Sequence, residues 1–254
     1  MFADTPYTLF VIAVLLLLYL AGGFVKGAAS FGQPMVTISL GVLFIPVPAA
    51  IAIAIVPAFL SNAVQAWGSW RAVSQLKPYA IFYLALVVGV VIGLSIFALL
   101  NQDALRAAIG CLLVVFALTQ LLGVSPPLTP PPHRGVLAVT GLVSGVCAGT
   151  TSFVGFPSLP VLIAYRLDRA LFALVTSIMF FITMSMLGGG LTLLGHFGPA
   201  ELVVGILCCV PSFFGQRIGL RVRDRMSVIA LRRLINVVLA AVGLVLAMRG
   251  LGIA

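Results

Sequence analysis

Long apolar stretches alternate with short polar ones along the whole chain. Apolar runs lie at 9–25, 49–66, 81–100, 112–123, 136–146, 171–186, 202–214 and 234–248. Several of these runs reach the ~20 residues that an α-helix needs to cross the hydrocarbon core of a bilayer, and others are shorter. The pattern predicts an all-α polytopic membrane protein.

The amino-acid composition supports this prediction. Of the 254 residues, 62% are hydrophobic and only 7% are charged. A soluble protein carries roughly 25% charged residues, so this chain lacks the composition of a water-facing exterior. No stretch is left over for a second domain, and we therefore predict a single transmembrane domain over 1–254.

The sequence contains an internal duplication. The motif GxxIGL at 89–94 recurs at 215–220, and Ala-Leu-Arg at 104–106 recurs at 230–232. Upstream, GFVKGAASFGQP at 23–34 aligns with GVCAGTTSFVGFP at 145–157. Glycine spacing alone could reflect helix packing, but it does not explain several motifs in the same order. We predict two repeats, 1–124 and 135–254, joined by a Pro-rich linker at 125–134 that cannot continue a helix.

The loop charges predict that the two repeats are inverted. Arg71 and Lys77 flank a loop whose counterpart at 196–201 is nearly neutral, whereas the loop at 101–103 corresponds to an Arg-rich loop at 217–233. Lys and Arg favour the cytoplasmic side of a membrane, so the bias reverses between the halves. Inversion requires an odd number of passes in each half.

We therefore expect ten helical segments, five in each half, with both termini outside. In the first half, helices at about 48–70, 78–100 and 104–122 follow a pair within 8–45 that is broken near 26–34. The corresponding pair in the second half, within 135–165, is broken near 148–157. Whether the first two segments of each repeat cross fully or are re-entrant is left open.

The two breaks are the candidate binding site. Pro34 and Pro157 suit the first turn of a helix, and Gly32 and Gly155 before them permit an unwound backbone. Free N–H groups and the positive end of the helix dipole make such a start an anion site. Inverted symmetry would aim the two starts at each other near the membrane midplane. The alternative is that these residues only kink packed helices.

Polar side chains near the breaks extend this hypothesis. Lys26 ends a long uncharged stretch. A cation within a membrane helix costs about 2.5–3.5 kcal/mol on insertion scales, so Lys26 indicates a functional role. The alternative is that the Lys26 side chain snorkels to the membrane interface. Hydroxyls and an amide can bond oxyanion oxygens, and phenylalanines could close the cavity. The predicted substrate-binding residues are Lys26, Ser30, Phe31, Gly32, Gln33, Pro34, Thr150, Thr151, Ser152, Phe153, Gly155 and Pro157.

Four further polar residues lie on the helices that follow the breaks. They are Asn62, Gln65, Thr176 and Ser177. We predict that they line the pathway, although polar contacts that hold membrane helices together explain them equally well.

With these motifs in view, the chain resembles the TauE/SafE family of sulfite and organosulfonate permeases over nearly its whole length. The resemblance rests on the paired Gly-rich breaks, on Ala-containing helix starts at 48–52 and 168–170, and on the GxxIG motifs followed by Ala-Leu-Arg. It implies a secondary transporter that exports small sulfur-containing anions, such as sulfite, sulfoacetate or related organosulfonates, across a bacterial inner membrane. The family is usually richer in glycine at 28–30 and 150–152, and we expect these positions to set substrate choice.

Other function classes fit the sequence less well. The sequence contains no P-loop, so this chain does not itself drive transport with ATP. An intramembrane protease would need a nucleophile beside a base. Both histidines and all acidic residues lie outside the predicted membrane core, so we predict no enzyme and no catalytic residue. An inside-negative potential would then assist expulsion of the anion. An anion channel, or a permease for another small organic anion such as a carboxylate, remains an alternative.

The remaining residues predict few partners. The four cysteines lie in apolar runs without metal-site or redox spacing, so we expect no metal and no cofactor. Most of the net charge of +9 comes from the loop at 217–233, which we interpret as orientation in the membrane rather than nucleic-acid binding. The expected partners are a small anion and the lipid bilayer, and a homodimer is left open.

Overall fold

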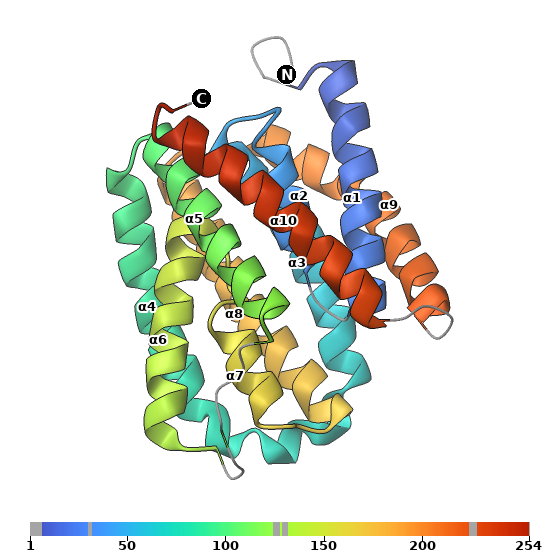
Figure 1. Ribbon diagram of the computed structural model, residues 1–254, viewed down its shortest axis with the longest axis vertical. Coiled ribbons are helices and arrows are strands. Elements are labelled where there is room, and N and C mark those ends of the chain that lie inside the picture. The colour runs from blue at the N-terminus through green and yellow to red at the C-terminus, as the bar shows by residue number, and fades with distance from the viewer. Residues whose placement is uncertain (1–6, 30–31, 124–127, 129–131, 224–227, 254) are drawn as a thin grey trace. The chain divides into compact units, whose positions relative to one another are not determined.

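The computed structural model describes residues 7–29, 32–123, 128, 132–223 and 228–253, except for the side chains of 29, 228–232 and 234. Within these ranges every regular element is helical and there is no strand. The α-helices are α1 (Leu9–Ala29), α2 (Gln33–Gly41), α3 (Val47–Gly68), α4 (Ala80–Leu99), α5 (Gln102–Leu121), α6 (Arg134–Thr151), α7 (Ser158–Ala164), α8 (Arg169–Leu193), α9 (Pro199–Arg223) and α10 (Val228–Gly250) (Figure 1). Two short 3-10 helices, η1 (Trp70–Gln75) and η2 (Lys77–Tyr79), connect α3 to α4.

Six of the described helices are long and apolar enough to cross a membrane. These candidate spans are Leu9–Ala28, Val47–Gly68, Lys77–Leu99, Gln102–Leu121, Arg169–Leu193 and Pro199–Arg223. They confirm the prediction of an all-helical, multi-pass membrane protein. The expected helices at 48–70, 78–100 and 104–122 correspond to α3, α4 and α5, with ends that differ by at most two residues.

The expected break in each half separates a long helix from a short one. In the first half it lies between α1 and α2, and in the second half between α6 and α7. At 1.5 Å per residue, the nine residues of α2 and the seven of α7 extend only about 14 and 10 Å. Neither short helix spans the ~30 Å hydrocarbon core by itself.

The chain divides into two compact units. Unit 1 contains Met1–Ala58, Asn101–Leu121 and Gly188–Ala254, and unit 2 contains Phe59–Leu100 and Leu122–Leu187. Each unit therefore takes helices from both halves of the sequence, and α3 and α8 each contribute residues to both units. The repeat boundaries, the linker at 125–134 and the inverted insertion stay predictions.

In unit 1, α1 packs along α9 and α5 packs along α10 (Figure 1). The α1–α9 pair is close because glycines let the two backbones meet: a Cβ placed on Gly215 would stand 2.8 Å from the backbone nitrogen of Phe24. The helix α2 folds back along α1. Gly22 of α1 faces Gln33 at the start of α2, whereas Gly41 at the end of α2 faces Leu15.

Unit 2 is built around an equivalent helix pair, α4 and α6 (Figure 1). A Cβ on Gly89 would stand 2.9 Å from the Cα of Gly145, and a Cβ on Gly93 would stand 2.8 Å from the Cα of Gly149. Close packing is therefore the local role of these glycines. The duplicated motif performs this role once in each unit, and each time it joins a helix of one sequence half to a helix of the other.

Candidate functional site

The chain turns from the first break into α2 at Gly32. This residue has φ 99° and ψ −1°, a left-handed conformation that glycine adopts without a steric penalty. Pro34 is the second residue of α2, as expected for a residue that lacks an N–H. The first bond of the helix runs from Val36 N to Gly32 O at 3.2 Å. The N–H groups of Gln33 and Met35 therefore lie in a first turn where the helix supplies no acceptor, and both residues are buried.

The side chain of Gln33 joins α2 to α9. Its Nε2 donates a hydrogen bond to Ser212 Oγ at 2.8 Å, and both residues are 1% exposed. Oε1 of Gln33 is buried without a partner, as is Oε1 of Gln216 on the next turn of α9. A hydroxyl can donate or accept, so reversing the Gln33 amide keeps the bond to Ser212 and frees Nε2 as a donor. Gln33 can therefore present either a donor or an acceptor to a ligand.

Lys26 lies in the last turn of α1 and is only 4% exposed. It follows Gly22 by four residues, so the two share a face of the helix, and Gly22 faces Gln33. Such burial does not fit a side chain that extends to the membrane surface, and it favours the interior role over snorkelling. In unit 1 the structure thus places Lys26, Gly32, Gln33 and Pro34 around the junction of α1 and α2.

The second break, in unit 2, has a different backbone from the one expected. The left-handed residue is Ser152, with φ 63° and ψ 13°, at the C-terminal cap of α6. Gly155, predicted to be the unwound position, has no positive φ. Pro157 precedes α7 as its N-cap instead of lying in its first turn. The left-handed turn of this break therefore lies at the C-terminal end of α6, at a serine that the glycine pattern of the sequence does not mark.

The hydroxyls of the second break differ in what they can offer a ligand. Thr150 Oγ1 donates to Gly93 O at 3.3 Å, and Thr151 Oγ1 donates to Cys147 O at 2.7 Å. Such bonds to backbone carbonyls are common for threonine in helices, and they occupy the protons that an anion would need. Ser152 Oγ is buried and has no hydrogen-bond partner. Of these three predicted hydroxyls, Ser152 is the one with an available proton.

The predicted pathway residues have mixed environments. Gln65 Nε2 donates to Ala173 O at 3.5 Å, and Thr176 Oγ1 donates to Phe172 O at 2.8 Å, so both serve contacts within unit 2. Asn62 is buried, and Ser177 is fully buried with no partner for its hydroxyl. Phe153 is also buried. The predicted site residues Ser30 and Phe31 lie outside the described residues.

Two buried serines near the breaks were not expected. Ser212 bonds Gln33 in unit 1, and Ser144 of α6 in unit 2 is fully buried without a hydrogen-bond partner. In the repeat alignment, Ser144 occupies the position of Gly22, which faces α2 in unit 1. A single serine within an apolar run carries no periodic signal, although the alignment could have pointed to Ser144.

The carboxylates that the structure describes lie at helix starts. Asp168 Oδ1 accepts hydrogen bonds from the backbone N–H groups of Ala170 and Leu171, each at 3.0 Å. Asp103 pairs with Arg106 at 2.9 Å in the first turn of α5. Glu201, in the first turn of α9, accepts a hydrogen bond from Tyr7. Among the described residues there is no group of three His, Cys, Asp or Glu side chains that could hold a metal ion.

A protein-family model described as "Sulfite exporter TauE/SafE" matches residues 15–246. The chain belongs to the TauE/SafE family. Comparison with curated proteins and with solved structures gives no significant match. The TauE/SafE match confirms the resemblance found in the sequence, and it identifies the chain as a membrane transporter of a family whose members are not enzymes. Both breaks and the duplicated glycines that join the two helix pairs lie within the residues that this family model matches.

Proposed function

We propose that this TauE/SafE transporter exports sulfite, sulfoacetate or a related organosulfonate across a bacterial inner membrane. The observation that carries the proposal is the buried cluster of a cation and hydrogen-bond donors at the start of α2, in a chain of this family. Sulfite and sulfonate groups present several anionic oxygens that accept N–H and O–H bonds. Taking such an anion out of water is costly unless each oxygen finds a partner.

In unit 1 the roles follow from the contacts around α2. The N–H groups of Gln33 and Met35 point out of the helix start, where the positive end of the helix dipole favours negative charge. The Gln33 amide, held by Ser212, adds a side-chain donor. Lys26 supplies positive potential from within the same unit. Because the nine-residue α2 contributes only a small dipole, we assign most of the attraction to Lys26 and the direct hydrogen bonds.

In unit 2 we assign the corresponding role to Ser152. Its unpartnered Oγ can donate to an anion oxygen, whereas Thr150 and Thr151 already donate to carbonyl oxygens. Phe153, Gly155 and Pro157 shape the turn beside it, and Ser177 is a further candidate along the pathway.

The membrane potential supplies the driving force in this proposal. A negative charge that moves outward across a potential of 100 mV, inside negative, gains about 2.3 kcal/mol of free energy. The carboxylates that the structure describes sit at helix starts, which supports uniport of the anion over coupling to a carboxylate-bound proton. Proteoliposomes loaded with sulfite and given an imposed potassium-diffusion potential should show efflux that increases with inside-negative potential. If sulfite efflux does not depend on the membrane potential and requires a proton gradient, this mechanism is rejected.

Binding can be tested separately from flux. A ligand that binds the native state raises its stability by mass action, so thermal unfolding should shift with sulfite or sulfonates and less with carboxylates. Ser152→Ala and Lys26→Met should reduce the shift. The matched controls are Ser185→Ala, at an exposed hydroxyl that bonds its own helix, and Arg249→Met, at an exposed cation. A shift that survives both test variants would move the anion site away from the breaks.

A further inference from the structure

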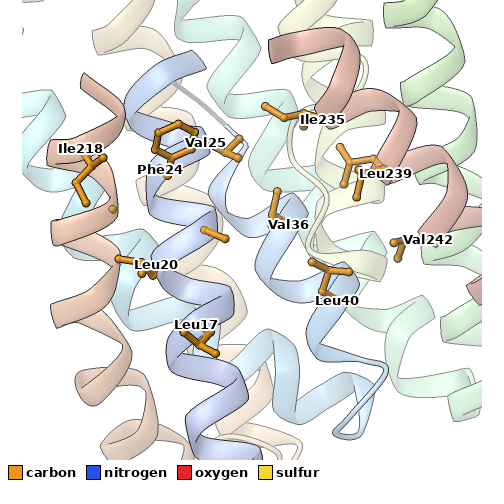
Figure 2. Close-up of a pocket in the computed structure, with 13 residues that line it drawn as sticks. Leu17, Leu20, Phe24, Val25, Val36, Leu40, Ile218, Ile235, Leu239 and Val242 are labelled. Carbon is orange, nitrogen blue, oxygen red and sulfur yellow. The ribbon is translucent and has the colours of Figure 1, made fainter. Parts of the chain in front are cut away.

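Unit 1 contains an apolar cavity of about 530 Å³ that the anion site does not use. Figure 2 shows side chains of α1, α2, α9 and α10 converging on it. Its lining residues are Leu17, Leu20, Ala21, Phe24, Val25, Val36, Leu40, Gly215, Ile218, Ile235, Val238, Leu239 and Val242. No lining residue has a polar or charged side chain, so the cavity cannot hold the transported anion.

The cavity opens at the surface of unit 1. Val36 and Leu239 form part of a buried floor, whereas Leu17, Ile218 and Val238 at the rim are 64%, 46% and 44% exposed. Along α1 the lining runs from Leu17 to Val25, which is about 12 Å at 1.5 Å per residue. This length is close to the depth of one leaflet, half of a hydrocarbon core of ~30 Å.

Two arginines stand beside one end of the cavity. Arg217 and Arg221 are both exposed on α9, and Arg221 lies three residues beyond the rim residue Ile218, on the same face of the helix. Helix α9 ends at Arg223 shortly after them. The cavity therefore combines an apolar channel of one-leaflet length with positive charge at the helix end, which matches an acyl chain joined to an anionic headgroup.

We propose that this cavity binds one acyl chain of an anionic phospholipid, with the phosphate of its headgroup at Arg217 and Arg221. The apolar floor and rim account for the chain, since only a hydrocarbon leaves no polar group unpaired there. The arginines account for the preference for an anionic lipid, because guanidinium groups bond phosphate oxygens well.

Native mass spectrometry of the full-length protein tests this proposal. The delipidated protein is given equal amounts of phosphatidylglycerol and phosphatidylethanolamine, and the retained lipid is measured. Ala21→Phe and, independently, Val238→Phe fill the cavity from its exposed rim, and Arg217→Gln with Arg221→Gln removes the headgroup contact. Val139→Phe, at an exposed apolar position of α6, and Arg249→Gln, at an exposed cation on α10, are the matched controls.

The wild type and both controls should retain phosphatidylglycerol several-fold better than phosphatidylethanolamine. Both filled variants should lose retention of either lipid, and the double arginine variant should lose only the preference. Equal retention of the two lipids by the wild type would overturn the headgroup assignment. If the two filled variants retain as much lipid as the control variants do, the assignment of the acyl chain to this cavity would be overturned. A dimer in the wild-type mass spectrum that is absent from the spectra of the filled variants would also overturn the proposal, because a second copy of the protein would then cover the cavity.

Discussion

The side-chain amide of Gln33 donates a hydrogen bond to Oγ of Ser212 at 2.8 Å, although 179 positions separate the two residues. The bond joins the short helix α2 of the first sequence half to α9 of the second. It makes α9 part of the wall around the α2 start, and it explains how an isolated serine of an apolar helix takes part in the proposed anion site.

Replacing Ser212 by Ala should weaken both the fold and the site. The change leaves the buried Gln33 amide without its partner, which costs about 1–3 kcal/mol of stability. Anion binding should fall by about tenfold, because the freed amide is no longer held in position. Thermal unfolding with and without sulfite measures both effects, and Ser185→Ala should stay within about 0.5 kcal/mol of wild type. Equal behaviour of the two alanine variants would show that the Gln33–Ser212 bond does not support the site.

Lys26 should contribute to anion binding through its charge. Lys26→Met keeps an unbranched side chain and removes that charge. Loss of the positive potential should lower anion affinity by about tenfold or more, and Lys26→Arg should restore part of it. The measurements are thermal unfolding and sulfite titration of the purified variants. If Lys26→Met binds sulfite with wild-type affinity, the charge of Lys26 plays no part in anion binding.

The close glycine contacts predict equal sensitivity in the two units. In α4, a Cβ on Gly93 would stand 2.8 Å from the Cα of Gly149, and in α9, a Cβ on Gly219 would stand 2.9 Å from the backbone nitrogen of Ala28. Gly93→Ala and Gly219→Ala should each cost about 1–3 kcal/mol through overpacking. At Gly189 an added Cβ would have no neighbouring atom within 4 Å, so Gly189→Ala should leave the free energy of unfolding unchanged or raise it slightly. Chemical denaturation in detergent micelles compares the three, and a harmless Gly219→Ala would contradict the equivalence of the two helix pairs.

The sequence predicted the parts of the fold that depend on local pattern. Apolar length located the long helices, and the Gly-x-Pro motif located the start of α2, because Gly32 permits the left-handed conformation before the helix and Pro34 fixes its own φ in the first turn. In the second break the same motif misplaced the unwound residue. There the left-handed position is Ser152, at the end of α6, and Gly155 has no positive φ.

The functional side chains were harder to predict for a different reason. The availability of a hydroxyl depends on its neighbours: Thr150 is engaged by a carbonyl of α4, which becomes a neighbour only when α4 and α6 pack together. Ser212 lies in an apolar run and acquires a role only through its hydrogen bond with Gln33 of another helix. The repeat signal could identify equivalent positions, but it could not show which hydroxyl protons remain free.

Tyr7 provides a pH-dependent test of the contact that ties the start of the described chain to α9. Its hydroxyl donates to Glu201 Oε1 at 2.7 Å, and burial, followed by this bond to a carboxylate, raises the pKa of Tyr7 above its usual value. A raised pKa means that the folded state holds the phenol proton more tightly, so the stabilisation is fully present below the unfolded pKa of about 10 and is lost as pH rises further.

Tyr7→Phe removes both the hydrogen bond and this titration. The variant should be less stable than wild type by about 1–3 kcal/mol at pH 8. The difference should narrow between pH 10 and 11, because only the wild type loses stability through Tyr7 over that range. Denaturation curves of the two proteins measured side by side cancel the effect of the other groups that titrate in alkali. A difference that stays constant from pH 8 to 11 would show that Tyr7 is not held as a neutral phenol against Glu201.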